Sequence, residues 1–302
     1  MSTIPQIVTT NWLAERLDDP KLRLIDATTF MKPLEDGGIT LSSGKESYQN
    51  GHIPGAVYAD VMNELSHPDF DQSFTVPPRD YFIEKVTNLG IGDEDTYTVI
   101  YDQGALVGVS VVAPYWASRL RWQLLYEGFE NIAVLDGGLP KWKEENRPLS
   151  KEKGTYPKAT FNGKRNEQLL ATKDDVLKAI GDESVLLINS LSPADFYGET
   201  NTYARKGHIP GSVNVFFGLH GNTETKETLS DEQLKRTFEQ VGALNPNKKI
   251  ITYCGGGIAA TWNALLLEKL GVKNVAVYDG SLNEWTADSS LPLTTGKKTT
   301  IN

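Results

Sequence analysis

Residues 250–261 have the sequence Ile-Ile-Thr-Tyr-Cys-Gly-Gly-Gly-Ile-Ala-Ala-Thr, which contains the only cysteine of the chain, Cys254. The apolar, β-branched run before the cysteine predicts a buried strand. After three glycines, apolar residues recur at helical spacing: Ile258, Trp262, Leu265, Leu266 and Leu270. The thiol is therefore expected in a tight turn between a strand and the start of a helix.

Such a turn gives a cysteine reactive surroundings. Glycines allow backbone N–H groups to approach and to point inward, and a helix N-terminus adds partial positive charge. Both effects favour the thiolate over the thiol, which makes Cys254 a candidate nucleophile. A free cysteine is often only a small core residue. The three consecutive glycines at this junction favour the reactive interpretation instead.

The composition is typical of a soluble globular protein long enough for two domains: 302 residues, 39% hydrophobic and 23% charged. The net charge of −9 argues against binding to nucleic acid or to an anionic membrane. One cysteine excludes an internal disulfide and a multi-cysteine zinc site, and no metal or organic cofactor is expected. The N-terminal residues lack a signal pattern, and no apolar run reaches the roughly 18 residues of a membrane span. A cytoplasmic location is therefore expected.

The two halves of the chain repeat the same motifs in the same order. The clearest pair is Gly-His-Ile-Pro-Gly, at residues 51–55 and again at 207–211. Three further pairs of segments match: 24–27 with 187–190, 99–102 with 251–254, and 133–142 with 276–285. Four matched blocks in one order indicate a duplicated domain rather than a solenoid.

Short β-rich runs alternate with helical patterns in both halves. We expect strands at 22–27, 97–101, 131–135, 185–189, 249–253 and 274–278, and helices at 10–18, 79–90, 107–126, 138–145, 172–180, 231–242, 258–270 and 281–287. This alternation implies a mostly parallel sheet covered by helices on both faces, with ligands bound beyond the carboxyl ends of the strands. The polar segment 146–164 is the expected linker between domains at 1–145 and 165–302.

The repeat separates shared residues from those found in one half only. The first half has Asp102 at the position of Cys254 and lacks the triple glycine, so we expect it to be inactive. His52 and His208 occur in both halves and are expected to be structural. The same comparison assigns the other shared residues to the framework: Asp136, Asp279, Trp142 and Trp285.

Two chemistries use a thiolate surrounded by backbone amides. A phosphatase loop closes with an arginine six residues after the cysteine, because a phosphoryl dianion needs a cationic clamp, and that position is Ala260 here. A persulfide carries a single charge, which N–H donors alone can stabilise in the manner of an oxyanion hole. The neutral loop thus favours sulfur over phosphate. A cysteine protease would need a partnered histidine, and no motif places His67 or His220 beside the thiol.

The chain resembles the rhodanese family in its tandem-domain form, the thiosulfate and 3-mercaptopyruvate sulfurtransferases. The twin Gly-His-Ile-Pro-Gly segments, the two Asp-Gly…Trp segments and the cysteine loop carry the resemblance. It implies two rhodanese-like α/β domains, each a mostly parallel five-stranded sheet flanked by helices, with an inactive first domain. It also implies a site between the domains, with Cys254 as the nucleophile and a loop that holds the persulfide, formed by Gly255, Gly256, Gly257, Ile258 and Ala259.

Some positions depart from the family pattern. Gly255 and Gly256 replace the basic residues that usually follow the cysteine in members acting on thiosulfate, and a common Asp-x-Arg is here Asn189-Ser190-Leu191. Arg205 and Lys206 are candidate replacements for that anion-binding arginine.

The expected function is transfer of sulfane sulfur from thiosulfate or 3-mercaptopyruvate to cyanide or a thiol through a persulfide on the cysteine. Two alternatives stay open. One is a cysteine-dependent phosphatase or arsenate-reductase relative, and the other is a non-catalytic redox or binding module.

Overall fold

The computed structural model describes residues 4–35, 39–69, 74–104 and 111–296. Ten of the strands in these residues form two sheets: β1 (Ile7–Val8), β2 (Leu22–Asp26), β5 (Val57–Tyr58), β6 (Tyr97–Tyr101), β7 (Ile132–Leu135), β8 (Leu170–Ala171), β9 (Val185–Asn189), β10 (Val213–Asn214), β11 (Lys249–Tyr253) and β12 (Val275–Tyr278). The first sheet has the order β1-β7-β6-β2-β5 and the second the order β10-β9-β11-β12-β8. All neighbouring strands in both sheets are parallel.

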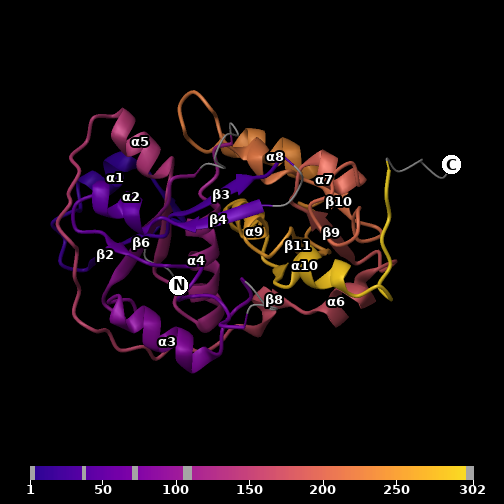
Figure 1. Cartoon of the computed structure of the whole chain (residues 1–302), viewed down its shortest axis with the longest axis horizontal. Helices are drawn as coiled ribbons and strands as arrows, with labels where there is room; N and C mark the ends of the chain where they lie inside the picture. The colour runs from indigo at the N-terminus through magenta and orange to yellow at the C-terminus, as the bar shows by residue number, and fades with distance from the viewer. Residues whose placement is uncertain (1–3, 36–38, 70–73, 105–110, 297–302) are drawn as a thin grey trace.

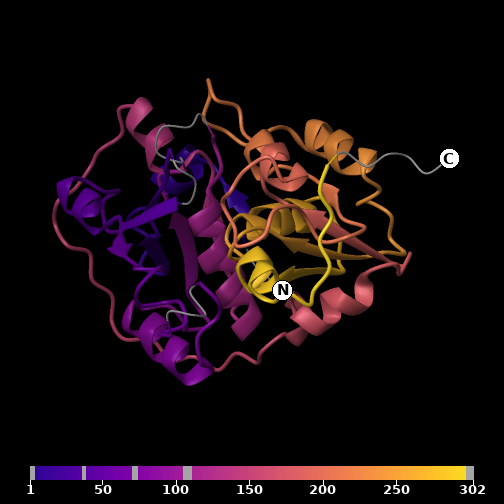
Figure 2. The same ribbon diagram turned by 45° about the vertical axis from the view of Figure 1, so that its right-hand side comes forward.

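Helices accompany each sheet. In the first domain they are α1 (Thr10–Ala14), α2 (Lys45–Asn50), α3 (Arg79–Asn88), α4 (Tyr115–Glu127) and α5 (Gly138–Glu144). In the second domain they are α6 (Lys173–Ala179), α7 (Pro193–Tyr197), α8 (Asp231–Gln240), α9 (Ala259–Lys269) and α10 (Ser281–Ala287), with 3₁₀ turns η2 (Glu167–Leu169) and η3 (Phe217–His220). Figure 1 shows the two domains side by side, with α4 and α9 next to each other between the sheets. The turned view keeps the two sheets apart, with α4 between them (Figure 2).

Every strand and helix expected from the sequence is present, most with ends within a few residues of the expected ones. The helix expected from residue 107 begins at Tyr115 instead, and this expectation is corrected. Pro114 precedes it and cannot donate a helical hydrogen bond, so it marks a helix start rather than a helix interior. Residues 105–110 lie outside the described part of the chain. The hairpin of β3 (Thr29–Pro33) and β4 (Ile39–Ser43) was not expected.

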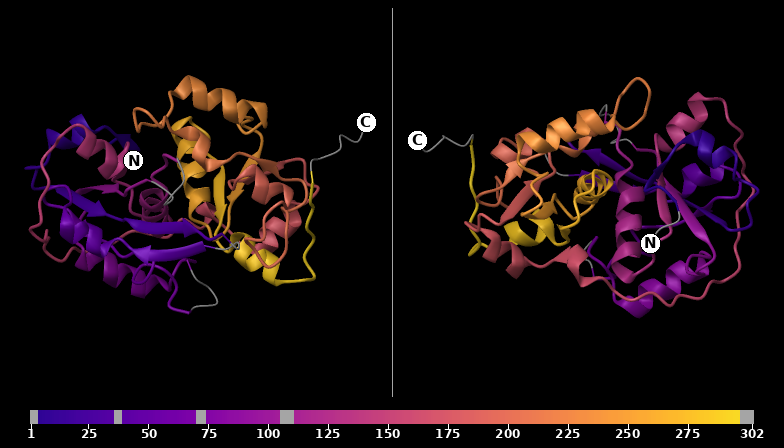
Figure 3. Two further views of the ribbon diagram at one scale, coloured as in Figure 1. Left: turned by 45° about the horizontal axis from the view of Figure 1, so that its top comes forward. Right: turned by 180° about the vertical axis from the view of Figure 1, so that it is seen from behind.

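The segment that joins the domains runs around the outer edge of the first one (Figure 1; Figure 3, right). Residues 151–166 contain no helix and no strand. Tyr156 fixes this segment to the first domain, because its hydroxyl donates to the carbonyl oxygen of Gly55 (2.9 Å) and accepts from the N–H of Leu24 (3.0 Å). The Ala159 N–H donates to the carbonyl oxygen of Thr87 (3.0 Å). The segment is thus bound along a surface rather than free in solution.

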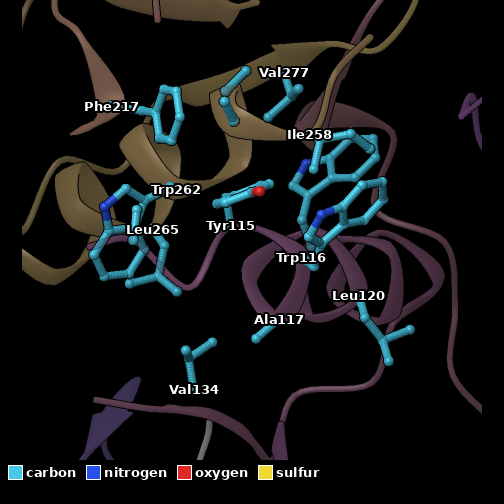
Figure 4. Packing of buried hydrophobic residues seen from close by; sticks show 14 of the residues in the cluster. Tyr115, Trp116, Ala117, Leu120, Val134, Phe217, Ile258, Trp262, Leu265 and Val277 are labelled. Atoms are coloured by element: carbon cyan, nitrogen blue, oxygen red, sulfur yellow. The ribbon is translucent and has the colours of Figure 1, made fainter. Parts of the chain in front are cut away.

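One hydrophobic cluster continues from the first domain into the second. Figure 4 shows its centre, where side chains of α4 meet those at the start of α9: Tyr115, Trp116, Leu120, Ile258, Trp262 and Leu265. Fully burying one such side chain contributes about 1.5–3 kcal/mol. Because the cluster crosses the domain boundary, the two domains pack as one unit around the cysteine loop.

Candidate active site

Cys254 follows β11 directly, at the carboxyl end of the central strand of the second sheet. The residue is only 2% exposed, but it lines a pocket of ≈ 740 Å³ whose wall comes from both domains. The hairpin β3–β4 reaches from the first domain toward the second (Figure 1). Its side chains form part of the pocket wall. The thiol therefore lies at the base of an opening large enough for a small organic molecule.

The backbone around the thiol is held from one side by α10. The Cys254 N–H donates to Ser281 Oγ (3.1 Å), and its carbonyl oxygen accepts from the N–H of Leu282 (3.1 Å). By contrast, the N–H groups of residues 255–260 donate to no protein atom within the described ranges. A helix N-terminus with unpaired N–H groups is suited to a bound anion. The loop thus offers six consecutive donors next to the cysteine.

Two of the glycines are required by their surroundings. Gly257 has φ +74°, and a Cβ atom there would lie 2.6 Å from the carbonyl oxygen of Asp279. At Gly255 a Cβ atom would lie 2.2 Å from the hydroxyl oxygen of Tyr203. Two of the three consecutive glycines are therefore needed for steric reasons, and Gly257 is needed for its backbone conformation as well.

The hydroxyl of Tyr203 lies against the loop and forms no hydrogen bond with the described residues. Burial raises the pKa of Tyr203 well above its usual value, and negative charge on Cys254 and Asp195 raises it further. The phenol therefore keeps its proton and is a hydrogen-bond donor available to a group bound at the cysteine. No motif or periodicity in the sequence singles out Tyr203.

Arg119 of α4 connects the first domain to the loop. Its Nη1 donates to Asp279 Oδ1 (2.6 Å) and to the carbonyl oxygen of Gly257 (3.1 Å), and its Nη2 donates to the carbonyl oxygen of Phe74. Its side chain is fully buried, and Asp279 neutralises its charge. Sequence reasoning missed this residue, for which the only sign was a charge inside an apolar helical pattern.

The equivalent loop of the first domain is occupied by its own side chain. Asp102 Oδ1 accepts from the N–H of Gly104 (2.7 Å), and Oδ2 accepts from those of Trp116 and Ala117 (2.9 Å each). These donors lower the pKa of Asp102, but burial outweighs them and raises it to about 7. The carboxyl group thus takes the amide donors that are unpaired in the second domain.

The histidines shared by the two halves have the same structural role. His52 Nδ1 is 2.7 Å from the carbonyl oxygen of Tyr48, and His208 Nδ1 is 2.7 Å from that of Phe196. Each imidazole also stacks on the ring of the same residue. The indole N–H groups of the shared tryptophans donate to equivalent carbonyls: Trp142 to Pro148, and Trp285 to Pro292.

The shared aspartates cross the domain boundary in both directions. Asp136 Oδ1 accepts from the N–H (2.8 Å) and the hydroxyl (2.6 Å) of Thr228 in the second domain. Asp279 Oδ2 accepts from the N–H of Val76 in the first domain (2.7 Å). Both residues are therefore part of the framework, and both join the two domains.

The other expected site residues are distributed as follows. Gly255, Gly256, Ile258 and Ala259 line the pocket with the cysteine, whereas Gly257 does not. Arg205 and Lys206, the expected anion-binding residues, are not among the residues that line this pocket. The guanidinium of Arg205 donates to four carbonyl oxygens at 2.6–3.0 Å, those of Trp285, Thr286, Asp288 and Leu291.

Comparison with known proteins identifies the family. A sequence model described as the rhodanese-like domain matches residues 9–145 and again residues 172–288. The chain belongs to the rhodanese family. The 3-mercaptopyruvate sulfurtransferase of Escherichia coli is 32% identical over 94% of this chain and 95% of that protein. Thiosulfate sulfurtransferase of Rattus norvegicus is 30% identical over 92% of this chain and 91% of that protein.

A solved structure supports the same assignment. The crystal structure of SseA from Escherichia coli matches with a TM-score of 0.75 at 30% identity, covering 92% of this chain and 99% of that one. The two α/β domains with parallel five-stranded sheets are thus two rhodanese domains in tandem, as the resemblance implied.

The wall of this pocket has no basic side chain in the described part of the chain. Leu191, which stands where the family commonly has an arginine, lines the pocket, and no Lys, Arg or His of the described residues does so.

In the described ranges no group of three or more His, Cys, Asp and Glu side chains could hold a metal ion. The described helices include none long and apolar enough to cross a membrane.

Proposed function

We propose that the protein is a sulfurtransferase that carries sulfane sulfur on Cys254. The observation that carries the proposal is the row of six N–H groups that donate to no described residue, beside a cysteine at the base of a pocket shared by both domains. A persulfide is an anion small enough to accept from such donors without a cationic side chain. The sulfurtransferase names of the relatives agree with this chemistry.

The reaction has two halves. The Cys254 thiolate attacks the outer sulfur of the donor, a new S–S bond forms, and the leaving group departs with the electron pair of the broken bond, as sulfite from thiosulfate or as the enolate of pyruvate from 3-mercaptopyruvate. The acceptor, cyanide or a thiolate, then attacks the outer sulfur, and the cysteine leaves as a thiolate. Such a scheme gives ping-pong kinetics. In this proposal the loop amides stabilise the persulfide, and the Tyr203 hydroxyl donates to the bound group.

The two alternatives fit the pocket less well. A phosphatase or arsenate-reductase relative would need a cationic clamp for its oxyanion, but Ala260 stands at that position and the described pocket wall has no basic side chain. A non-catalytic module would not need a thiol at the base of a cavity beside unpaired donors. We therefore retain sulfur transfer as the function.

The test is the mass of the intact protein after incubation with thiosulfate or with 3-mercaptopyruvate. We expect a gain of one sulfur atom in the wild type and none in Cys254→Ser, which retains the size of the side chain. Sulfur release to cyanide under steady-state conditions should be lost in the same variant. Absence of any sulfur gain from these donors and from inorganic polysulfide would refute the proposal.

A further inference from the structure

The charged side chains that line the Cys254 pocket are of one sign. Among the described residues they are Glu35, from the β3–β4 hairpin, and Asp195, from α7. Neither carboxylate forms an ion pair with a described residue. Since the reactive cysteine is itself anionic as a thiolate or a persulfide, negative charge in this pocket is not neutralised by a neighbouring side chain.

Asp195 is fixed in place by hydroxyl groups rather than by a cation. Its Oδ1 accepts from Thr200 Oγ1 (2.6 Å) and Thr202 Oγ1 (2.9 Å), and its Oδ2 accepts from Ser192 Oγ (2.6 Å). Hydroxyl donors hold a carboxylate in position without adding a compensating positive charge. The same three hydroxyl-bearing residues line the pocket. The carboxylate is therefore a built part of the wall.

Neither of the two arginines near the site, Arg119 and Arg205, contributes to the lining of the pocket. The guanidinium of Arg119 is paired with Asp279 and donates to two backbone carbonyls, and it does not line the pocket. Arg205 donates to the backbone carbonyl oxygens of Trp285, Thr286, Asp288 and Leu291, and it does not line the pocket either. An anionic substrate would thus meet carboxylates, with the loop amides already occupied once the persulfide has formed.

The rest of the wall suits an organic group. Six aromatic side chains contribute to it: Phe74, Tyr115, Trp116, Tyr203, Phe216 and Phe217. Aromatic faces attract cations by their quadrupole and accept apolar groups equally well. A pocket of aromatic rings with a carboxylate on its rim recognises an organic molecule that is positively charged or neutral.

We propose, on the basis of the sulfurtransferase function above, that this pocket selects cationic or neutral organic sulfur acceptors over anionic ones, and that Asp195 sets the preference. In the step concerned, the acceptor thiol loses its proton to solvent, and its thiolate attacks the outer sulfur of the Cys254 persulfide. A new S–S bond forms on the acceptor, and the cysteine leaves as a thiolate. The amine of a cationic acceptor takes no part in the bond changes and pairs with the carboxylate of Asp195.

The experiment follows the second half-reaction alone. The full chain is converted to the persulfide with whichever donor transfers sulfur, freed of excess donor, and mixed with cysteamine (cationic), 2-mercaptoethanol (neutral) or 3-mercaptopropionate (anionic). Loss of the extra sulfur is followed by mass in single turnovers. We expect the cysteamine to 3-mercaptopropionate rate ratio to fall about threefold to fivefold in Asp195→Asn, the range of a partly exposed charge pair. Comparing each variant with the wild type cancels the intrinsic reactivity of the thiols.

Two further measurements keep the inference testable if Asp195→Asn does not fold. The substitution Glu35→Gln should lower the ratio in the same direction, and raising the salt concentration should do so in the wild type. The matched control Asp174→Asn, an exposed aspartate on α6 outside the pocket, should leave the ratio unchanged. A ratio insensitive to salt and to both pocket substitutions would overturn this inference alone. If the cysteine takes up no sulfur from any donor, the proposed function fails and this inference fails with it.

Discussion

Replacing Arg119 by methionine is the perturbation that tests how the first domain supports the active loop. Methionine keeps much of the length of the side chain but removes the charge and the three donated hydrogen bonds. The substitution leaves the Asp279 carboxylate, whose side chain is 7% exposed, without its cation. Its remaining donor is the N–H of Val76 (2.7 Å). The carbonyl oxygens of Gly257 and Phe74 lose a partner as well.

The magnitude follows from the burial of the pair. Breaking a buried ion pair on one side destabilises a protein by about 3–5 kcal/mol, because it leaves an uncompensated buried charge. Replacing both partners is far milder, so the double variant Arg119→Met/Asp279→Leu should recover part of the loss. We also expect slower persulfide formation in the single variant, because Gly257 belongs to the loop and loses its contact with the guanidinium.

Urea unfolding followed by tryptophan fluorescence measures the stability, and the gain of sulfur mass measures the reaction. The matched control is Arg236→Met on α8, whose partner Glu232 is highly exposed, so the expected loss is below about 0.5 kcal/mol. The reasoning is refuted if Arg119→Met loses less than about 1 kcal/mol, or if the double variant is no more stable than the single one.

Three further perturbations probe the loop and two buried titratable groups. Gly257→Ala should cost about 1–3 kcal/mol in urea unfolding and slow persulfide formation, because the position has positive φ and the Asp279 carbonyl blocks a Cβ atom. The pKa of Asp102 is about 7 in the folded chain and 3.8 in a free side chain, so the folded state holds an extra proton between these values. Stability should fall as the pH rises from about 4 to about 7, and urea midpoints for Asp102→Asn should vary less over that range. Burial lowers the pKa of His220 from 6.5 to about 4. The contribution of this residue to stability therefore falls as the pH decreases from about 6.5 to about 4. His220→Gln should lose less stability than the wild type over that range in urea unfolding, and an identical loss in both would contradict the reasoning.

The parts of the fold that the sequence revealed are those with a strong local pattern. The central strands and the long helices repeat apolar residues at their own period, and they lie where that pattern placed them. The strands β1, β5, β8 and β10 have only two residues each and exist through pairing with a neighbour. Such pairing is not encoded in the short segment itself, so these edge strands could not be predicted.

In the site, too, the residues that are adjacent in the sequence could be predicted, and those that come together only in the fold could not. The cysteine and its glycines stand together in the chain, and local chemistry was sufficient to single them out. Arg119 is far from them in sequence and reaches the loop only because α4 packs beside α9. Arg205 is the opposite case. It lies just before a conspicuous motif, but its guanidinium donates to backbone carbonyl oxygens of residues 285–291.

The reciprocal aspartate contacts reveal how the two domains are related in space. Asp136 reaches Thr228 and Asp279 reaches Val76, and Val76 precedes Thr228 by the same number of residues as Asp102 precedes Cys254. Equivalent helices, α4 and α9, also pack against each other. An aspartate of the first domain thus binds the second domain, and the equivalent aspartate of the second domain binds the equivalent position of the first. Such reciprocal contacts are typical of two identical subunits related by a twofold axis. The two domains of this single polypeptide are thus arranged like the two subunits of a symmetric dimer. Of the two equivalent loops, one carries Cys254 and the other is filled by the carboxylate of Asp102.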